Sequence, residues 1–155
     1  MTTKGKKIAV VTGGARRIGR VIAEHLHRLG FDIALHYHHS VDSAQSLAGE
    51  LCERRAGSCQ LFAADLEDQT QVSTLAEQLL AHYSIINLLV NNASGFAPTP
   101  IESCTPAQFD SMLACNLRAP YFLIQGLLPA LRGGGASIGN ILDAHADHSL
   151  RRFIA

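Results

Sequence analysis

A glycine-rich segment near the N-terminus has the composition of a phosphate-binding loop. Residues 12–19 (TGGARRIG) follow a short apolar run and precede a helical pattern of apolar residues. Gly13 permits a tight turn, and Gly19 allows the helix to pack closely against the preceding strand. The first N–H groups of a helix lack partners and lie at the positive end of its dipole, which favours a bound pyrophosphate. An ordinary glycine-rich turn is the alternative, but a dinucleotide loop requires this position between strand and helix.

Two arginines and the end of the second predicted strand bear on the identity of the nucleotide. Arg16 and Arg17 can form forked hydrogen bonds to phosphate oxygens, unless both are solvated residues of a helix start. An NAD enzyme carries Asp or Glu at the end of this strand, whereas residues 36–38 are His, Tyr and His. With no carboxylate to repel it, a 2′-phosphate can bind Arg16 and residues 38–40. We therefore expect NADPH as the cofactor.

The same histidines raise the alternative of a metal site. His36 and His38 would share one face of a strand, with His39 next to them. No acidic ligand is adjacent, so we expect no metal.

Asp143 is a candidate acid–base residue because it follows an apolar run that predicts a strand over residues 136–142. A carboxylate at a strand end that faces a cleft can hold or orient a proton. Asp147 stands close by in the sequence and is the alternative carboxylate.

The elements that must position these residues alternate between strands and helices. Apolar residues at helical spacing predict the helices; Asp68 caps one of them, and a capping box at Thr105 and Gln108 opens the last, which breaks at residues 133–135. The fold class is therefore α/β, a Rossmann-like doubly wound parallel sheet truncated after about the fifth strand, in one incomplete domain over residues 1–155. Strand carboxyl ends then share one edge, where ligands of such sheets bind. Short apolar runs predict the strands over residues 8–12, 32–37, 60–64, 86–90 and 136–142.

The composition fits a globular protein and argues against several classes. The 155 residues contain 13 Lys plus Arg and 13 Asp plus Glu, so no basic excess points to nucleic acid. No stretch approaches the ~20 apolar residues of a membrane span, and the N-terminus lacks the apolar run of a signal peptide. The four cysteines (Cys52, Cys59, Cys104 and Cys115) lack zinc-binding spacing, and we expect reduced thiols in a cytoplasmic protein.

Together these motifs resemble the short-chain dehydrogenase/reductase family. Thr12 and Gly13 open its TGxxxGxG motif and Gly19 closes it. Residues 91–93 (NNA) follow the fourth predicted strand, and Asn116 stands in the long helix. The resemblance covers the chain from about the seventh residue onward.

Four departures from the common family pattern are similar to its pteridine reductase branch. Arg17 replaces the middle glycine, and the second strand runs into residues 36–40 (HYHHS). Ser94, followed by Phe96, replaces the glycine of the usual NNAG, and Asp143 stands where the catalytic serine usually does. The resemblance implies a pterin substrate, whose ring nitrogen receives a proton relayed by the carboxylate while NADPH delivers hydride to carbon.

The resemblance also implies a substrate-binding and catalytic set. Arg17 reaches both the cofactor phosphates and the substrate, which Ser94, Phe96 and Asp143 also bind. Phe96 can stack on a flat heterocycle, unless it is a loop aromatic folded onto the core. Asp143 and Asn116 take part in catalysis.

A larger set is expected to bind the cofactor along the strand ends. In it, Asp65 caps the adenine, unless it is merely a turn residue before the helix capped by Asp68. Residues 92–94 line the nicotinamide-ribose side. The set consists of Gly13, Arg16, Arg17, Ile18, Gly19, Tyr37, His38, His39, Ser40, Ala64, Asp65, Leu66, Asn92, Ala93 and Ser94.

The family also needs a proton-donating Tyr followed four residues later by a Lys, and no pair in this sequence has that spacing. By the family's spacing the Tyr falls one residue past Ala155. We therefore expect an N-terminal fragment, inactive alone, of an NADPH-dependent pterin reductase that is a homotetramer in full-length form, with no nucleic-acid or membrane partner. The alternatives are a carbonyl or 3-ketoacyl reductase, disfavoured by Arg17 and Asp143, and a non-catalytic NADP-sensing protein.

Overall fold

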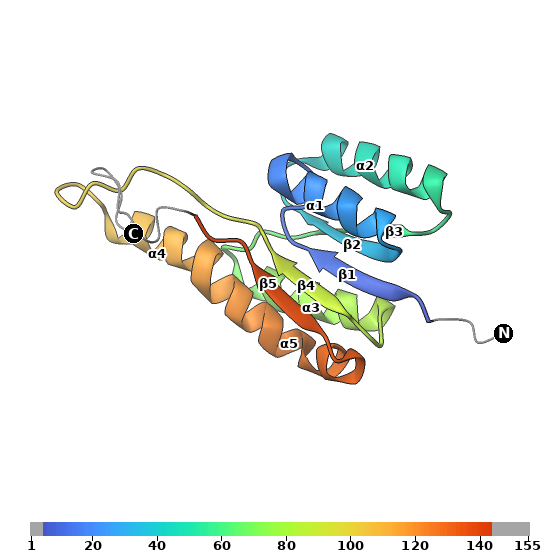
Figure 1. Cartoon of the computed structure of the whole chain (residues 1–155). Coiled ribbons are helices and arrows are strands. Elements are labelled where there is room, and N and C mark those ends of the chain that lie inside the picture. The colour runs from blue at the N-terminus through green and yellow to red at the C-terminus, as the bar shows by residue number, and fades with distance from the viewer. Residues whose placement is uncertain (1–4, 144–155) are drawn as a thin grey trace.

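The computed structural model describes residues 5–143, which form alternating strands and helices (Figure 1). The strands are β1 (Lys7–Val11), β2 (Phe31–Tyr37), β3 (Cys59–Ala63), β4 (Leu88–Asn91) and β5 (Ser137–Asn140). The helices are α1 (Arg17–Arg28), α2 (Val41–Arg54), α3 (Gln69–His82), α4 (Pro106–Leu113) and α5 (Ala119–Gly134), with a π-helical turn η1 (Ala114–Arg118) between the last two.

The five strands form one parallel sheet in the order β3-β2-β1-β4-β5. Near the end of β1, Val11 pairs with Leu35 on one side and with Val90 on the other. The carboxyl ends of all five strands therefore reach the same edge of the sheet. This arrangement confirms the predicted Rossmann-like α/β fold.

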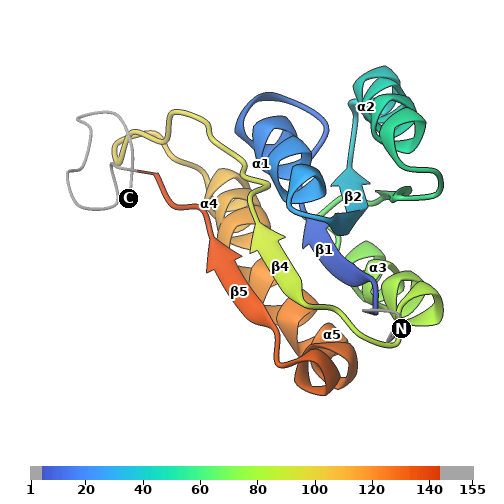
Figure 2. The same cartoon turned by 45° about the vertical axis from the view of Figure 1, so that its right-hand side comes forward.

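Helices cover the two faces of the sheet and create two apolar layers (Figures 1 and 2). Ala9 and Val11 pack with Leu47 and Leu51 beneath α1 and α2. The alternate residues of β1 face the other way and pack with residues of α3 and α5 such as Leu79 and Leu127. Because successive side chains of a strand point to opposite faces, β1 is buried from both sides, which explains its continuous apolar sequence.

Several predicted boundaries are confirmed and others are corrected. The Asp68 side chain accepts from the amides of Thr70 and Gln71, and Thr105 and Gln108 form the capping box. The prediction that residues 133–135 break the helix was wrong for the first two glycines, since α5 continues to Gly134 and ends at Gly135 in the left-handed conformation. A Cβ on Gly134 would lie 2.7 Å from Cγ2 of Ile85, so this glycine serves close packing. The last two strands also begin later and β5 ends earlier than predicted.

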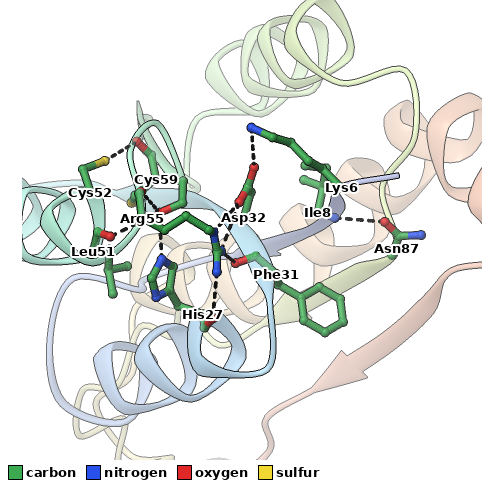
Figure 3. A network of polar contacts seen from close by, with 11 residues as sticks. Lys6, Ile8, His27, Phe31, Asp32, Leu51, Cys52, Arg55, Cys59 and Asn87 are labelled. Atoms are coloured by element: carbon green, nitrogen blue, oxygen red, sulfur yellow. Dashed lines mark hydrogen bonds and ion pairs between the residues drawn. The ribbon is translucent and has the colours of Figure 1, made fainter. Parts of the chain in front are cut away.

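The amino ends of the strands carry a network of paired charges (Figure 3). The buried carboxylate of Asp32 lies 3.0 Å from the Arg55 guanidinium and 3.2 Å from Lys6 Nζ. His27 is buried nearby, with Nε2 2.7 Å from the Ser58 hydroxyl. These contacts tie α1 and α2 to the start of β2 and leave each of these polar groups with a partner inside the protein.

Within residues 5–143, no helix is both long enough and apolar enough to cross a membrane.

Candidate functional site at the carboxyl edge of the sheet

The loop between β1 and α1 depends on two glycines. Gly13 has φ +60°, and a Cβ there would lie 2.9 Å from Cα of Ala93. A Cβ on Gly19 would lie 2.2 Å from the carbonyl oxygen of Gly13 and 2.5 Å from Nδ2 of Asn92. The turn and the start of α1 therefore approach the segment after β4 more closely than any side chain would allow.

Thr12 and Asn92 fasten that segment to the loop. The buried Thr12 hydroxyl accepts from the amides of Asn92 (2.9 Å) and Ala93 (3.0 Å). Nδ2 of Asn92 donates to the carbonyl oxygens of Thr12 (2.9 Å) and Gly13 (3.1 Å). At the next strand, Asn91 donates to Asn140 Oδ1 (2.8 Å). The ends of β1, β4 and β5 are thus joined by side-chain hydrogen bonds.

His36, at the end of β2, contacts the loop from the opposite side. Its Nδ1 accepts from the amide of Gly13 (3.1 Å), and its Nε2 lies 3.0 Å from the carbonyl oxygen of Ala64. Burial lowers the pKa of this imidazole from 6.5 to about 4, against a smaller opposing effect of the Ala64 carbonyl. Both ring nitrogens are therefore occupied by the backbone, which argues against the metal alternative for His36. No group of three metal-ligating side chains occurs among residues 5–143.

Arg16 and Arg17 lie exposed at the start of α1, whose first turn contains no acidic residue. Arg17 has φ +50°, the only positive φ of a non-glycine residue in the described part of the chain. Both arginines line an open pocket of about 440 Å³, which also includes Asp42. Arg20, at the side of this pocket, is already paired with Glu24 and Glu50, whereas neither Arg16 nor Arg17 has an ion-pair partner within residues 5–143. Ala15, Ser43 and Ser46 complete the lining.

The ends of β2 and β3 bring two further predicted groups side by side. The amide of Ala64 donates to the carbonyl of Tyr37 (3.1 Å). His38 and His39 are exposed and their rings are stacked, with centroids 3.5 Å apart. Nδ1 of His38 lies 3.9 Å from Oδ1 of Asp65. Ser40 stands at the N-cap of α2 and Leu66 is buried beneath the turn. The residues predicted to bind an adenosine are thus neighbours.

The segment after β4 leads toward the predicted substrate side. Asn116, in η1, donates to the carbonyl of Gly95 (2.8 Å) and accepts from its amide (3.0 Å). This double contact fixes the segment between Ser94 and Phe96, both of which are exposed. A π-helical turn inside a longer helix is uncommon and is frequent at functional sites.

A contact that the sequence did not suggest supports this segment from below. Glu67 accepts from the hydroxyl of Ser111 (2.7 Å) through its carboxylate and from Arg118 (2.8 Å) through its backbone carbonyl. These residues have no recognisable motif, and only the packing of the turn after β3 against η1 brings them together.

Asp143 lies three residues after β5, exposed at the same edge of the sheet as the loop. The intervening backbone is held to β4, because the amide of Ile141 donates to the carbonyl of Asn91 (2.9 Å). The alternative carboxylate, Asp147, lies outside the described residues. The edge therefore offers anion-binding groups at α1 and a carboxylate beside β5.

This geometry fits a dinucleotide. The first N–H groups of α1 have no partner within the helix, and two arginines without an ion-pair partner among residues 5–143 lie beside them. Gly13 and Gly19 let the loop fold tightly against the segment after β4. Ile18, in the first turn, is exposed.

Comparisons with known proteins agree with this arrangement. The family model described as short chain dehydrogenase matches residues 7–153. Pteridine reductase 1 of Leishmania tarentolae is 32% identical over 96% of this chain and 65% of its own length. Elsinochrome reductase 1 of Elsinoe fawcettii is 30% identical over 85% of this chain and 49% of its own length. Sorbitol dehydrogenase of Cereibacter sphaeroides is 33% identical over 83% of this chain and 48% of its own length. The chain thus spans about half to two thirds of the length of these relatives.

Proposed function

The chain belongs to the short-chain dehydrogenase family, and on that premise we propose that the whole protein is an NADPH-dependent reductase of pterins. Membership of this family supports an oxidoreductase. The cofactor preference and the substrate are the proposal, and each is supported by residues at the carboxyl edge.

The observation that carries the pterin assignment is the backbone of Arg17. A φ of +50° is a conformation that glycine adopts freely and that costs other residues about 1 kcal/mol or more. The common family motif has glycine at this place, whereas here an arginine adopts a conformation that glycine tolerates better. Strain of this kind is often retained where it positions a functional group. The exposed guanidinium of Arg17 supports a role toward both phosphate and substrate, as in the branch that the sequence resembles.

Several groups support NADPH as the cofactor. The amides at the start of α1 and the side chain of Arg17 would hold the diphosphate, and Arg16, with residues 38–40, would hold the 2′-phosphate. No carboxylate stands at the end of β2 to repel that phosphate. When bound, NADPH supplies the hydride. The protein residues bind the nucleotide and orient it along the edge toward β5.

The groups beside β4 and β5 would act on the substrate. Phe96, 59% exposed, offers an aromatic face to a flat heterocycle. Asn116 keeps the segment from Ser94 to Phe96 in place by its two contacts with Gly95. Asp143 would hold or orient the proton that moves to a ring nitrogen, since a pterin presents both N–H donors and ring nitrogens.

A carbonyl or 3-ketoacyl reductase is the second candidate. It is favoured by the similarity to sorbitol dehydrogenase, whose identity of 33% is close to the 32% of pteridine reductase 1. Arg17 and Asp143 argue against it, because a carbonyl reductase needs only a hydroxyl at the position of Asp143, where it holds the carbonyl oxygen.

The test is a comparison of substrates with the whole protein. NADPH oxidation would be followed by absorbance with 7,8-dihydrobiopterin and with an acetoacetyl thioester. We expect kcat/KM to be at least about 10²-fold higher for the pterin, since a site built for polar ring atoms strongly rejects substrates that lack them. A preference for the thioester would favour the second candidate, and absence of turnover with any substrate would favour a non-catalytic NADP-sensing protein.

The proposal includes a homotetramer in the cytoplasm. Phe109, Leu113, Leu117 and Tyr121 recur every four residues along α4, η1 and α5, and all four are exposed. Such a stripe on one helix face is typical of an interface between subunits. Light scattering on the whole protein would give its mass, and Leu117→Glu should lower it.

A further inference from the structure

His36 joins three strand ends through one buried side chain. It belongs to β2, its Nδ1 contacts Gly13 after β1, and its Nε2 contacts Ala64 after β3. The side chain is only 2% exposed. Neither the glycine motif nor the expected 2′-phosphate group includes this residue.

The two contacts determine which nitrogen carries the proton. The Gly13 amide can only donate, so Nδ1 must present its lone pair. The Ala64 carbonyl can only accept, so Nε2 must carry hydrogen. The ring is therefore neutral, in agreement with its pKa of about 4, which burial lowers against the contrary effect of the carbonyl. The electrostatic effect of the nearby His38 lowers the pKa of His36 further, in the same direction as burial.

These contacts decide which loop amides are left for an anion. The amide of Gly13 donates to the ring, and the amide of Gly14 donates to the carbonyl of His36 (3.0 Å). On the other side, the Gly13 carbonyl accepts from Asn92. The first two N–H groups of the loop therefore point toward β2. An anion can therefore use neither of these two amides, whereas the amides that begin α1, at residues 17–19, have no partner within the helix and remain open to it.

We propose that His36 is a positioning residue of the cofactor site: as its Nε2–H tautomer it holds the first turn of the loop against β2 and β3, and thereby directs the amides of residues 17–19 toward the diphosphate. This inference rests on the proposed binding of NADPH. It also predicts a signature, because NADPH and NADH share the diphosphate and differ only at the 2′ position.

Loss of positioning should therefore weaken both nucleotides alike. His36→Leu removes both ring contacts, and His36→Gln retains one acceptor and one donor. We expect His36→Leu to raise the Kd of NADPH and of NADH about tenfold or more, with their ratio unchanged within about twofold, and His36→Gln to restore part of the loss. The matched control is His39→Leu at the exposed end of the same segment, which should weaken NADPH more than NADH.

A measurement on the unsubstituted protein does not depend on how the variants fold. Nitrogen-15 NMR of the nucleotide-free protein at pH 7 should show His36 protonated at Nε2 and not at Nδ1, and the Gly13 amide should exchange slowly with solvent. A ring protonated at Nδ1, or a Gly13 amide that exchanges as fast as a loop amide, would overturn the proposal.

The binding results separate this inference from the proposed function. If the unsubstituted protein binds both nucleotides and His36→Leu binds them equally well, the role of His36 is refuted and the cofactor assignment stands. If His36→Leu weakens NADPH alone, His36 acts on the 2′-phosphate and the positioning role is wrong. If the unsubstituted protein binds neither nucleotide, the proposed function fails, and the role of His36 toward the diphosphate fails with it.

Discussion

At the amino edge of the sheet, the charged side chains around β2 are paired with one another. Asp32 lies between Lys6 and Arg55, and His27 contacts the Ser58 hydroxyl. At the carboxyl edge a buried histidine is present as well, but its partners are the backbone of the glycine loop.

The arginines of the two edges also differ in whether they form ion pairs. Arg16 and Arg17 have no ion-pair partner within residues 5–143, and Arg17 holds a strained backbone, whereas Arg55 at the amino edge is paired. The number of polar side chains therefore does not distinguish the proposed cofactor edge from the amino edge. The carboxyl edge differs because two of its arginines have no ion-pair partner within residues 5–143 and can therefore bind a ligand. Substitutions at the amino edge should reduce stability, and substitutions of exposed residues at the carboxyl edge should reduce binding or turnover.

The largest expected effect is on stability as the pH is lowered. The pKa of His36 lies at about 4 in the folded protein and near 6.5 when unfolded, so the unfolded chain binds more protons between these values. The stability that neutral His36 contributes to the free energy of unfolding is fully present above pH 6.5 and is lost as the pH falls toward 4. At ~1.4 kcal/mol per pKa unit, this amounts to about 3 kcal/mol. Urea unfolding at pH 7 and pH 4.5 would measure it.

The control for that effect is the histidine at the other edge. Burial also lowers the pKa of His27, which changes stability in the same direction. Its partner is the Ser58 hydroxyl, which donates to backbone carbonyls and can accept from the ring nitrogen whether the ring is neutral or protonated. His36→Gln should therefore flatten the pH dependence more than His27→Gln does. A pH dependence that His36→Gln leaves unchanged would contradict a pKa of about 4 for His36.

The next effect should appear in turnover, with stability unaffected. Asp143→Asn in the whole protein keeps the shape of the side chain and removes its acid–base function. We expect kcat for dihydrobiopterin to fall ~10²-fold or more, while the Kd of NADPH and the thermal midpoint stay nearly constant. Asp143→Ser should behave alike and retain or gain activity on ketones. Unchanged kcat in both variants would remove the chemical basis of the pterin assignment, and the same loss in Asp147→Asn would indicate the other carboxylate.

Substitution of Asp32 should do the opposite: it should lower stability and leave nucleotide binding unchanged. Asp32→Ala leaves the Arg55 guanidinium without its carboxylate, and we expect the free energy of unfolding to fall by about 2 kcal/mol, less than for a fully buried pair because Arg55 is 39% exposed. Lys6→Ala, whose side chain is 73% exposed, is the matched control and should change stability by less than about 1 kcal/mol. NADPH affinity should be preserved in both. A large loss of affinity at unchanged stability would mean that the amino edge takes part in binding.

The smallest effect is the loss of one phosphate contact. Arg16→Ala should cost NADPH roughly tenfold in affinity, about 1.5 kcal/mol, and should leave NADH almost unaffected. Arg28→Ala, in the last turn of the same helix, provides a control for lost charge. Equal losses for both nucleotides would show that Arg16 acts on the shared diphosphate instead.

Periodicity and local chemistry were enough to predict the strand–helix alternation, the cap at Asp68 and the capping box at Thr105, because each depends on residues close in sequence. The continuation of α5 through Gly134 could not be predicted, since it depends on the approach of Ile85.

The candidate site likewise has features that the sequence predicts and features that only the fold creates. Gly13 and Gly19 were recognisable from their spacing, as was the absence of an acid after β2. The double contact of His36 was not, because Gly13 and Ala64 become its neighbours only when β1, β2 and β3 pair. Its signal in the sequence is a histidine at a buried strand end, a pattern that suggests a metal ligand as readily as a hydrogen-bonding residue.

The binding of NADPH and NADH to the whole protein tests most directly whether the carboxyl edge is the cofactor site. Fluorescence titration of both nucleotides under identical salt and pH would give the two dissociation constants. An edge with two arginines that have no ion-pair partner among residues 5–143, and with no acid after β2, predicts that NADPH binds at least about tenfold more tightly. Equal affinities, or tighter binding of NADH, would contradict the assignment of this edge to a 2′-phosphorylated nucleotide.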